Sequence, residues 1–79
     1  MIFKKGDSGV GVKKIQNWLN EHGYDSGPED GIFGEKTRDA VIQFQSAVET
    51  NPDGVADERT QIEMRKVDTG RDMKNSPFK

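Results

Sequence analysis

Cysteine is absent from this 79-residue chain, and histidine, tryptophan and tyrosine occur once each. Without cysteine the chain forms neither a disulfide nor a cysteine-ligated metal site. A zinc site takes three or four nitrogen or sulfur ligands in most proteins, so the lone His22 is expected to be a surface or helix-capping residue. Glycoside cleavage needs paired carboxylates around a held sugar ring, and a helical domain of this size offers little enclosure. We therefore expect no catalytic residues, no metal and no cofactor.

Long apolar runs and a dominant charge are also missing. No run approaches the roughly 20 apolar residues of a membrane-spanning helix, and residues 1–5 lack the apolar core of an export signal. The formal net charge is -2, with acids and lysines interspersed. Three short helices can imitate a helix-turn-helix unit, but this charge provides no basic field for a nucleic-acid backbone. We expect neither a membrane nor a nucleic acid as partner.

The first half of the chain contains one clear helical pattern. Apolar residues at spacings of three and four predict a helix over about 9–22. Asp7 or Ser8 is expected to cap its start, and Gly23 to end it in a left-handed conformation. The apolar stripe consists of Val12, Ile15, Trp18 and Leu19, and polar residues, Gln16 among them, fill the other face.

Two further stripes follow, each after a loop that contains Pro and Asp-Gly. One predicts a helix over about 35–48, built on Thr37, Ala40, Val41, Phe44, Ala47 and Val48. The other has Asp57 as its expected cap and is built on Thr60, Met64 and Val67. From Asp68 onward the sequence has no period and few apolar residues. We predict an all-α, three-helix domain over 1–67 and a flexible tail or linker over 68–79.

The chain also contains an internal repeat with a constant offset of 23 residues. Residues 30–37 (DGIFGEKT) align with residues 53–60 (DGVADERT), with identities at Asp, Gly, Glu and Thr. Glycine permits the positive φ of a tight turn, and the aspartate can accept hydrogen bonds from nearby backbone amides. Each copy is predicted to form an Asp-Gly turn, a short extended apolar pair and a helix start.

In this order and spacing the motifs resemble the peptidoglycan-binding domain 1 family of the PGBD-like superfamily. That family typically reads Gly-x-x-Gly-x-x-Val, Leu-Gln-x-x-Leu, Gly-Tyr, Asp-Gly-x-Phe-Gly-x-x-Thr, Ala-Val-x-x-Phe-Gln and a second Asp-Gly turn followed by Thr. The resemblance covers about residues 3–67 and implies a small three-helix bundle. The matching residues are Gly6, Gly9, Val12, Ile15, Gln16, Leu19, Gly23, Tyr24, residues 30–34, Thr37, Ala40, Val41, Phe44, Gln45, residues 53–55 and Thr60.

The resemblance also implies a ligand surface around the loop after the first helix and the start of the second. The candidate ligand-binding residues are Tyr24, Asp30, Ile32, Phe33 and Thr37, with Trp18 as an additional sugar-stacking candidate. Core packing competes with ligand contact for the three aromatic residues, and a structural role competes for Asp30 and Thr37. Ile32 is the better candidate for an exposed apolar contact.

The function implied by the resemblance is non-catalytic binding of peptidoglycan. Such a module holds an attached or partner peptidoglycan hydrolase, as in a phage endolysin or a bacterial autolysin, at high local concentration on its polymer. We expect a monomer that acts at the cell wall, in the periplasm, or outside the cell after lysis. The alternative is a protein–protein interaction module of the same fold that has lost wall binding, which the polar third helix favours.

Overall fold

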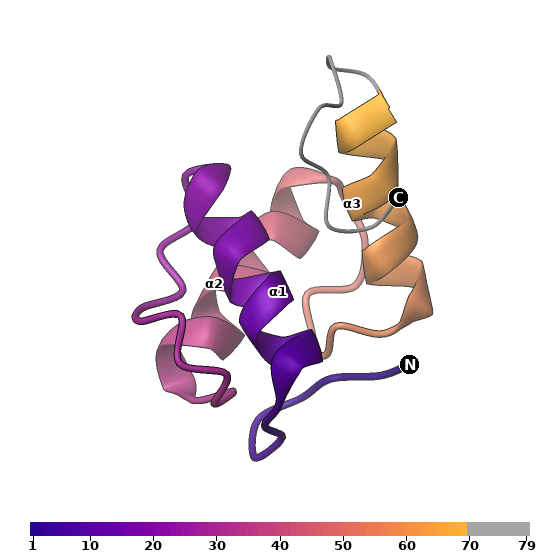
Figure 1. The fold of residues 1–79 in the computed structure, drawn as a ribbon. Coiled ribbons are helices and arrows are strands. Elements are labelled where there is room, and N and C mark those ends of the chain that lie inside the picture. Colours follow the sequence, from indigo (N-terminus) through magenta and orange to yellow (C-terminus); the bar gives the residue numbers. More distant parts are fainter. Residues whose placement is uncertain (70–79) are drawn as a thin grey trace.

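The computed structural model describes residues 1–69, without the side chain of Thr69, and contains three helices. These are α1 (Val10–Glu21), α2 (Glu35–Ala47) and α3 (Glu58–Thr69). The loop between α1 and α2 lies on one side of the molecule and α3 on the other (Figure 1). Within residues 1–69 the β-type pairings are two isolated antiparallel bridges, Phe3 with Ala56 and Ser8 with Ile32. The predicted all-α, three-helix fold is confirmed.

Two helix boundaries differ from the sequence-based expectations in an informative way. The start of α1 is capped by Gly9, whose φ is 129°, and no side chain caps it. The expected caps at Asp7 and Ser8 are therefore wrong, and a carboxylate oxygen of Asp7 instead accepts the backbone N–H of Lys4 at 3.0 Å. At the other end of the domain α3 continues to Thr69, two residues beyond the expected limit. The rest of the predicted tail, residues 70–79, lies outside the described residues.

Two other helix ends agree with the expectations from the sequence. Gly23 follows α1 with φ 87°, the left-handed conformation expected of a residue that ends a helix. Asp57 precedes α3, and its Oδ1 accepts the backbone N–H of Thr60 at 2.9 Å. This bond satisfies one of the free N–H groups in the first turn of α3.

The core lies between the three helices and the two turns that precede α2 and α3. Phe3 packs against it from the N-terminal segment, which pairs with Ala56 through N–H···O bonds of 3.1 and 2.8 Å. The Phe3 ring approaches α1 so closely that a Cβ at Gly11 would lie 2.5 Å from it. Ala47, expected in the apolar stripe of α2, is exposed. The buried apolar residues are Val12, Ile15, Trp18, Leu19, Phe33, Ala40, Val41, Phe44, Ala56 and Met64.

A cluster around Trp18 joins the end of α1 to the last turn of α3. The Trp18 side chain is fully buried, and its Nε1–H lies 3.1 Å from both carboxylate oxygens of Asp68. His22 stacks on the indole with ring centroids 3.9 Å apart, and its Nε2 lies 3.7 Å from Asp68 Oδ1. His22 is half-buried against Trp18, so the expected surface position is wrong, while the expected capping position is confirmed because His22 is the C-cap of α1. Asp68, expected to begin the tail, is part of the packed domain.

No helix in the described part of the chain is long and apolar enough to cross a membrane.

Candidate functional site

The first Asp-Gly turn is held to α1 and α2 by one buried amide, that of Gln16. Its Nε2 lies within hydrogen-bond distance of Asp30 Oδ1 (3.2 Å), the Ile32 carbonyl (2.9 Å) and Thr37 Oγ1 (3.0 Å). Its Oε1 accepts the backbone N–H of Gly31 at 2.9 Å. Gln16 is 1% exposed, so its expected place on the polar face of the helix is wrong. A buried amide with all its groups paired fixes the turn against both helices.

The second Asp-Gly turn is held in the same way by Gln45 of α2. Its Nε2 lies 3.0 Å from Asp53 Oδ1, 3.0 Å from the Val55 carbonyl and 2.9 Å from Thr60 Oγ1. Its Oε1 accepts the N–H of Gly54 at 2.9 Å. Gln16 directly follows the core residue Ile15 in α1, and Gln45 directly follows the core residue Phe44 in α2. Each Asp-Gly turn is therefore held by a glutamine of the helix before it, and we call this arrangement the glutamine clamp.

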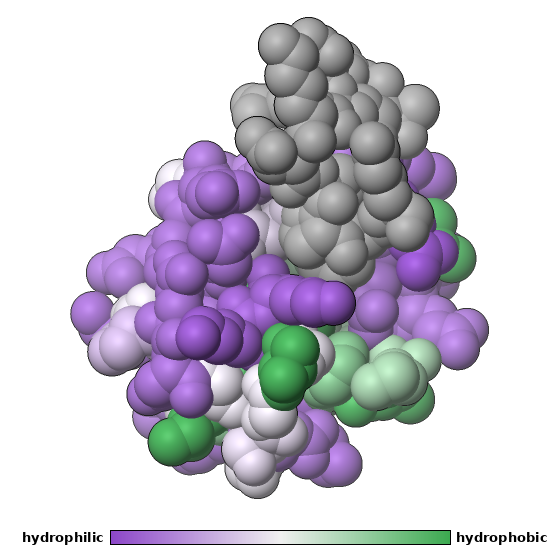
Figure 2. Space-filling model, viewed as in Figure 1, coloured by the Kyte–Doolittle hydropathy of each residue, from purple (hydrophilic) through white to green (hydrophobic). Residues whose placement is uncertain are grey.

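A surface groove of about 280 Å³ borders the first of these two networks. Its floor contains the buried side chains of Gln16 and Thr37, and its walls come from the α1–α2 loop and the first turn of α2. Most of the face of the domain seen in Figure 2 is hydrophilic, with smaller hydrophobic areas along its lower part. Ile32 is an exposed apolar side chain on the groove lining, with 60% of its surface exposed. The groove is lined by Gln16, Ser26, Pro28, Asp30, Ile32, Gly34, Glu35, Lys36 and Thr37.

The structure brings three of the six candidate residues together and separates the others. Asp30, Ile32 and Thr37 line the groove. Trp18 and Phe33 are 0% and 1% exposed, so neither ring is available to a ligand in this conformation.

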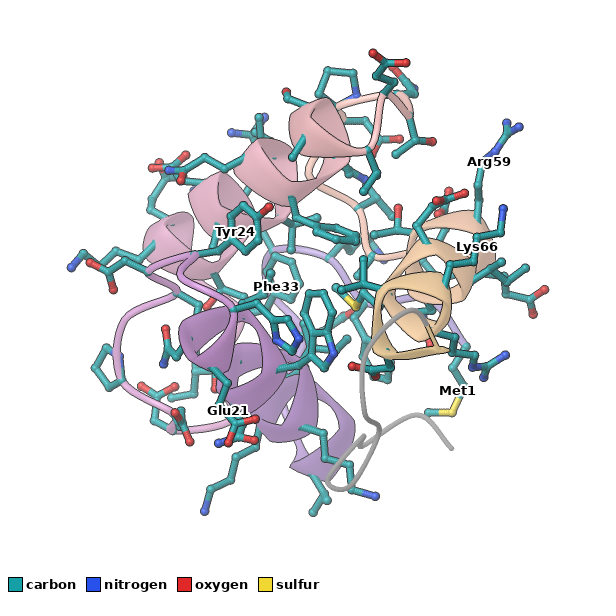
Figure 3. The ribbon with its side chains drawn as sticks, turned by 90° about the horizontal axis from the view of Figure 1, so that it is seen from above. Met1, Glu21, Tyr24, Phe33, Arg59 and Lys66 are labelled. Carbon is teal, nitrogen blue, oxygen red and sulfur yellow. The ribbon has the colours of Figure 1, made fainter. Side chains whose placement is uncertain are left out.

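Tyr24 is the remaining candidate, and it lies outside the groove. It is half-buried, and its ring meets the edge of Phe44 with centroids 5.7 Å apart. Figure 3 places its ring alongside α2. The aromatic candidates therefore contribute to packing, while the groove carries an aliphatic side chain.

Sequence reasoning missed six groove residues: Gln16, Ser26, Pro28, Gly34, Glu35 and Lys36. Gln16 could have been found, because in both α1 and α2 a glutamine directly follows a large core residue, and each of these helices is followed by an Asp-Gly turn. Ser26 and Pro28 carry no such signal, since their place depends on the path of the α1–α2 loop.

Two carboxylates that line the groove have lowered pKa values. The pKa of Asp30 is lowered by the backbone N–H of Ile32 and then by the Gln16 amide, because both donate to the ionised form. The pKa of Glu35 is lowered by the hydrogen bond and charge of Lys5. Both side chains therefore stay ionised to a lower pH than an ordinary Asp or Glu side chain.

The same holds for two carboxylates on the loop beside the groove. The backbone N–H of Gly27, followed by Lys36, lowers the pKa of Asp25. The side-chain amides of Asn20 and Asn17 lower the pKa of Glu29. Charged side chains of both signs therefore lie on and beside the groove.

Within residues 1–69 no group of three or more His, Cys, Asp or Glu side chains is placed to hold a metal ion. The groove lining itself offers the exposed aliphatic side chains of Pro28 and Ile32 and the charged side chains of Asp30, Glu35 and Lys36.

Residues 8–64 match the model of a family described as "Putative peptidoglycan binding domain". The chain belongs to this peptidoglycan-binding domain family. Membership associates the chain with the cell wall, because peptidoglycan is the polymer of that wall. It also explains why the sequence motifs occur in this order around two similar turns.

Known proteins with similar sequences or folds carry this domain in different settings. The carboxy-terminal processing protease CtpB of Bacillus subtilis (strain 168) is 38% identical over 68 residues, which covers 78% of this chain and 14% of the protease. The N-terminal domain of SleB has the same fold, with a TM-score of 0.81, 31% identity, and coverage of 85% of this chain and 92% of that one. The endolysin of Burkholderia phage AP3 gives a TM-score of 0.78 at 32% identity, covering 90% of this chain and 26% of the endolysin. The chain thus corresponds to a small part of the protease and of the endolysin.

Proposed function

We propose that this domain binds peptidoglycan through the groove beside the first Asp-Gly turn, without catalysing a reaction. The observation that carries the proposal is Ile32, an isoleucine 60% exposed on a groove whose backbone is fixed by the buried Gln16 amide. An exposed apolar side chain on a rigid turn loses little conformational freedom on binding, so its contact energy goes into affinity. Membership of a peptidoglycan-binding family names the polymer.

The biological role that fits this binding is the attachment of a peptidoglycan hydrolase to its polymer. The phage endolysin and the processing protease are far longer than this chain, as expected if the domain accompanies other domains in them. A tethered enzyme meets its substrate at a much higher local concentration than a free one. We infer that the domain acts as a monomer at the cell wall, as part of a larger protein or after lysis.

The test is depletion of the purified chain from solution by insoluble peptidoglycan sacculi, with turbidity recorded on the same suspension. We expect depletion without clearing. Absence of depletion by sacculi of several wall types would contradict the proposal and favour a protein partner for the same groove. Clearing would show that the chain hydrolyses the wall.

A matched pair of variants locates the surface. Ile32→Ala removes three carbons from the groove, and Ile62→Ala makes the same change at a side chain of α3 that is 45% exposed. At about 0.8 kcal/mol for each buried carbon, partial burial of Ile32 by the ligand predicts about 5- to 30-fold weaker binding for Ile32→Ala. Ile62→Ala should bind sacculi as the parent does. Equal effects of the two substitutions would place the binding surface elsewhere.

A further inference from the structure

The floor of the groove is polar in composition but has little hydrogen-bonding capacity left for a ligand. Gln16 is saturated by the turn it holds. Thr37 Oγ1 donates to the Ser26 carbonyl at 3.2 Å and accepts from Gln16. Ser26 Oγ lies 3.1 Å from both the Gln16 carbonyl and Asn20 Oδ1. A ligand rich in hydroxyl groups would find these partners occupied by the fold itself.

The groove also lacks the aromatic surface on which a sugar ring stacks. None of its lining residues is aromatic. The Trp18 and Phe33 rings are buried in the core, and Tyr24 packs its ring against Phe44. The apolar face of a sugar would have only aliphatic side chains to contact.

Aliphatic surface and paired charges are what the groove does offer. Ile32 and Pro28 are exposed on its lining. On the rim, Lys36 Nζ lies 3.4 Å from Asp25 Oδ2, and Lys5 Nζ bonds to Glu35 Oε1. All four charged side chains are more than half exposed, so both pairs are weakly held and can exchange their partners for charges on a ligand.

We propose that the groove recognises the peptide stem of peptidoglycan and not its sugar rings. A stem peptide carries small aliphatic side chains and ionised carboxylate and ammonium groups. These match Ile32 and Pro28 in the groove, and the opposite charges of Lys36 and Glu35 on its rim. The inference rests on the proposed wall binding and specifies which part of the polymer makes the contact.

The experiment compares two competitors for binding to intact sacculi. One is the mixture of free stem peptides released from sacculi by an amidase that cuts the bond between muramic acid and the peptide. The other is the peptide-free glycan left by the same digestion. We expect the stem peptides to release the bound chain and the glycan to leave it bound. Release by the glycan, with none by the peptides, would overturn the inference and leave wall binding intact. Failure of the chain to bind intact sacculi would instead refute the proposed function.

A second pair of variants tests the charged rim. Lys36→Gln removes the cation beside Asp25, and Lys66→Gln removes an equally exposed lysine that pairs with Glu63 on α3 at 3.3 Å. Figure 3 shows Lys66 on α3, pointing away from the domain. We expect Lys36→Gln to weaken binding of the stem peptides about three- to tenfold and to reduce its dependence on salt. Lys66→Gln should leave both unchanged. Indistinguishable behaviour of the two variants would exclude the rim charges from recognition.

Discussion

Replacing Gln16 with leucine should destabilise the domain, because this one side chain satisfies two backbone groups that have no other hydrogen-bond partner within residues 1–69. Gly31 donates its N–H to Gln16 Oε1, and the Ile32 carbonyl accepts from Gln16 Nε2. Leucine has a similar volume and makes neither bond. Asp30 and Thr37 keep other partners, since Asp30 Oδ1 also accepts from the Ile32 N–H and Thr37 Oγ1 still donates to the Ser26 carbonyl.

The size of the effect follows from those two unsatisfied groups. A buried donor or acceptor without a partner costs about 1–3 kcal/mol. The Gly31 N–H is buried, so leaving it without an acceptor should cost the full penalty. The Ile32 carbonyl is partly buried, so hydration can offset part of its penalty. We therefore expect Gln16→Leu to lose about 2–4 kcal/mol. A domain of this size has a total stability of about 4–12 kcal/mol, so the variant should still fold over most of that range.

Urea denaturation measures this loss, with Trp18 fluorescence and circular dichroism recorded in parallel to test two-state behaviour. Gln45→Leu is the matched control in the second network. It removes the acceptor of the Gly54 N–H, but the Val55 carbonyl keeps a 3.4 Å contact with Thr60 Oγ1. The control should lose somewhat less stability and leave sacculus binding unchanged. A loss below about 0.5 kcal/mol for Gln16→Leu would refute the claim that its amide holds the turn.

Three more predictions concern the packing and the charges. Asp68→Ala removes the carboxylate that accepts the buried Trp18 Nε1–H, and urea denaturation should show a stability loss of about 1.5–3 kcal/mol. An unchanged midpoint would mean that this contact of the last turn of α3 adds no stability to the domain. Gly31→Ala adds a Cβ to a residue with φ 78°, at 3.0 Å from the Gly9 carbonyl oxygen, and should lower the stability by at least about 1–2 kcal/mol. The control Gly34→Ala adds a Cβ where φ is -108° and the surrounding space is open, so its stability loss should be well below that. Acidification should destabilise the domain, because the folded pKa values of Asp25, Glu29, Asp30 and Glu35 lie below their ordinary values of 3.8 for Asp and 4.5 for Glu. Their stabilisation is complete above those values and is lost as pH falls through the lowered ones, so the urea midpoint should stay level from pH 7 to about 5.5 and fall below about 4.5; a midpoint that rises in acid would contradict this.

The helices could be predicted from the sequence because their stripes report local geometry. Apolar spacing of three and four located α1 and α2 to within a residue, since each stripe must face the core for the helix to be stable. The end of α3 was missed because its last turn is held by a contact with another helix, which the local sequence pattern does not report. Asp68 is polar and follows a weak stripe, yet Trp18, 50 residues earlier, donates a buried hydrogen bond to it.

The groove was only partly predictable, for a similar reason. Periodicity shows which face of a helix a residue occupies but not how deeply its side chain is buried. It therefore could not decide whether the Trp18 ring is buried in the core or exposed for a sugar to stack on. It also treats every glutamine as polar surface. Gln16 is buried because four polar groups around the turn satisfy its amide, and those groups come together only after the loop has closed.

The glutamines of the two Asp-Gly networks make corresponding hydrogen bonds, yet the groove borders the first network and includes no residue of the second. The difference lies in the loop before each turn. Between the end of α1 and Asp30 the chain contributes Ser26 and Pro28, which form part of the groove wall, and Thr37 donates back to the Ser26 carbonyl. In the second network the hydroxyl of the corresponding threonine, Thr60, donates to the Val55 carbonyl of its own turn. The glutamine clamp is therefore a structural unit used twice, and the groove arises where the longer loop supplies a wall beside it. Shortening that loop should consequently remove the groove while the clamp and the fold persist.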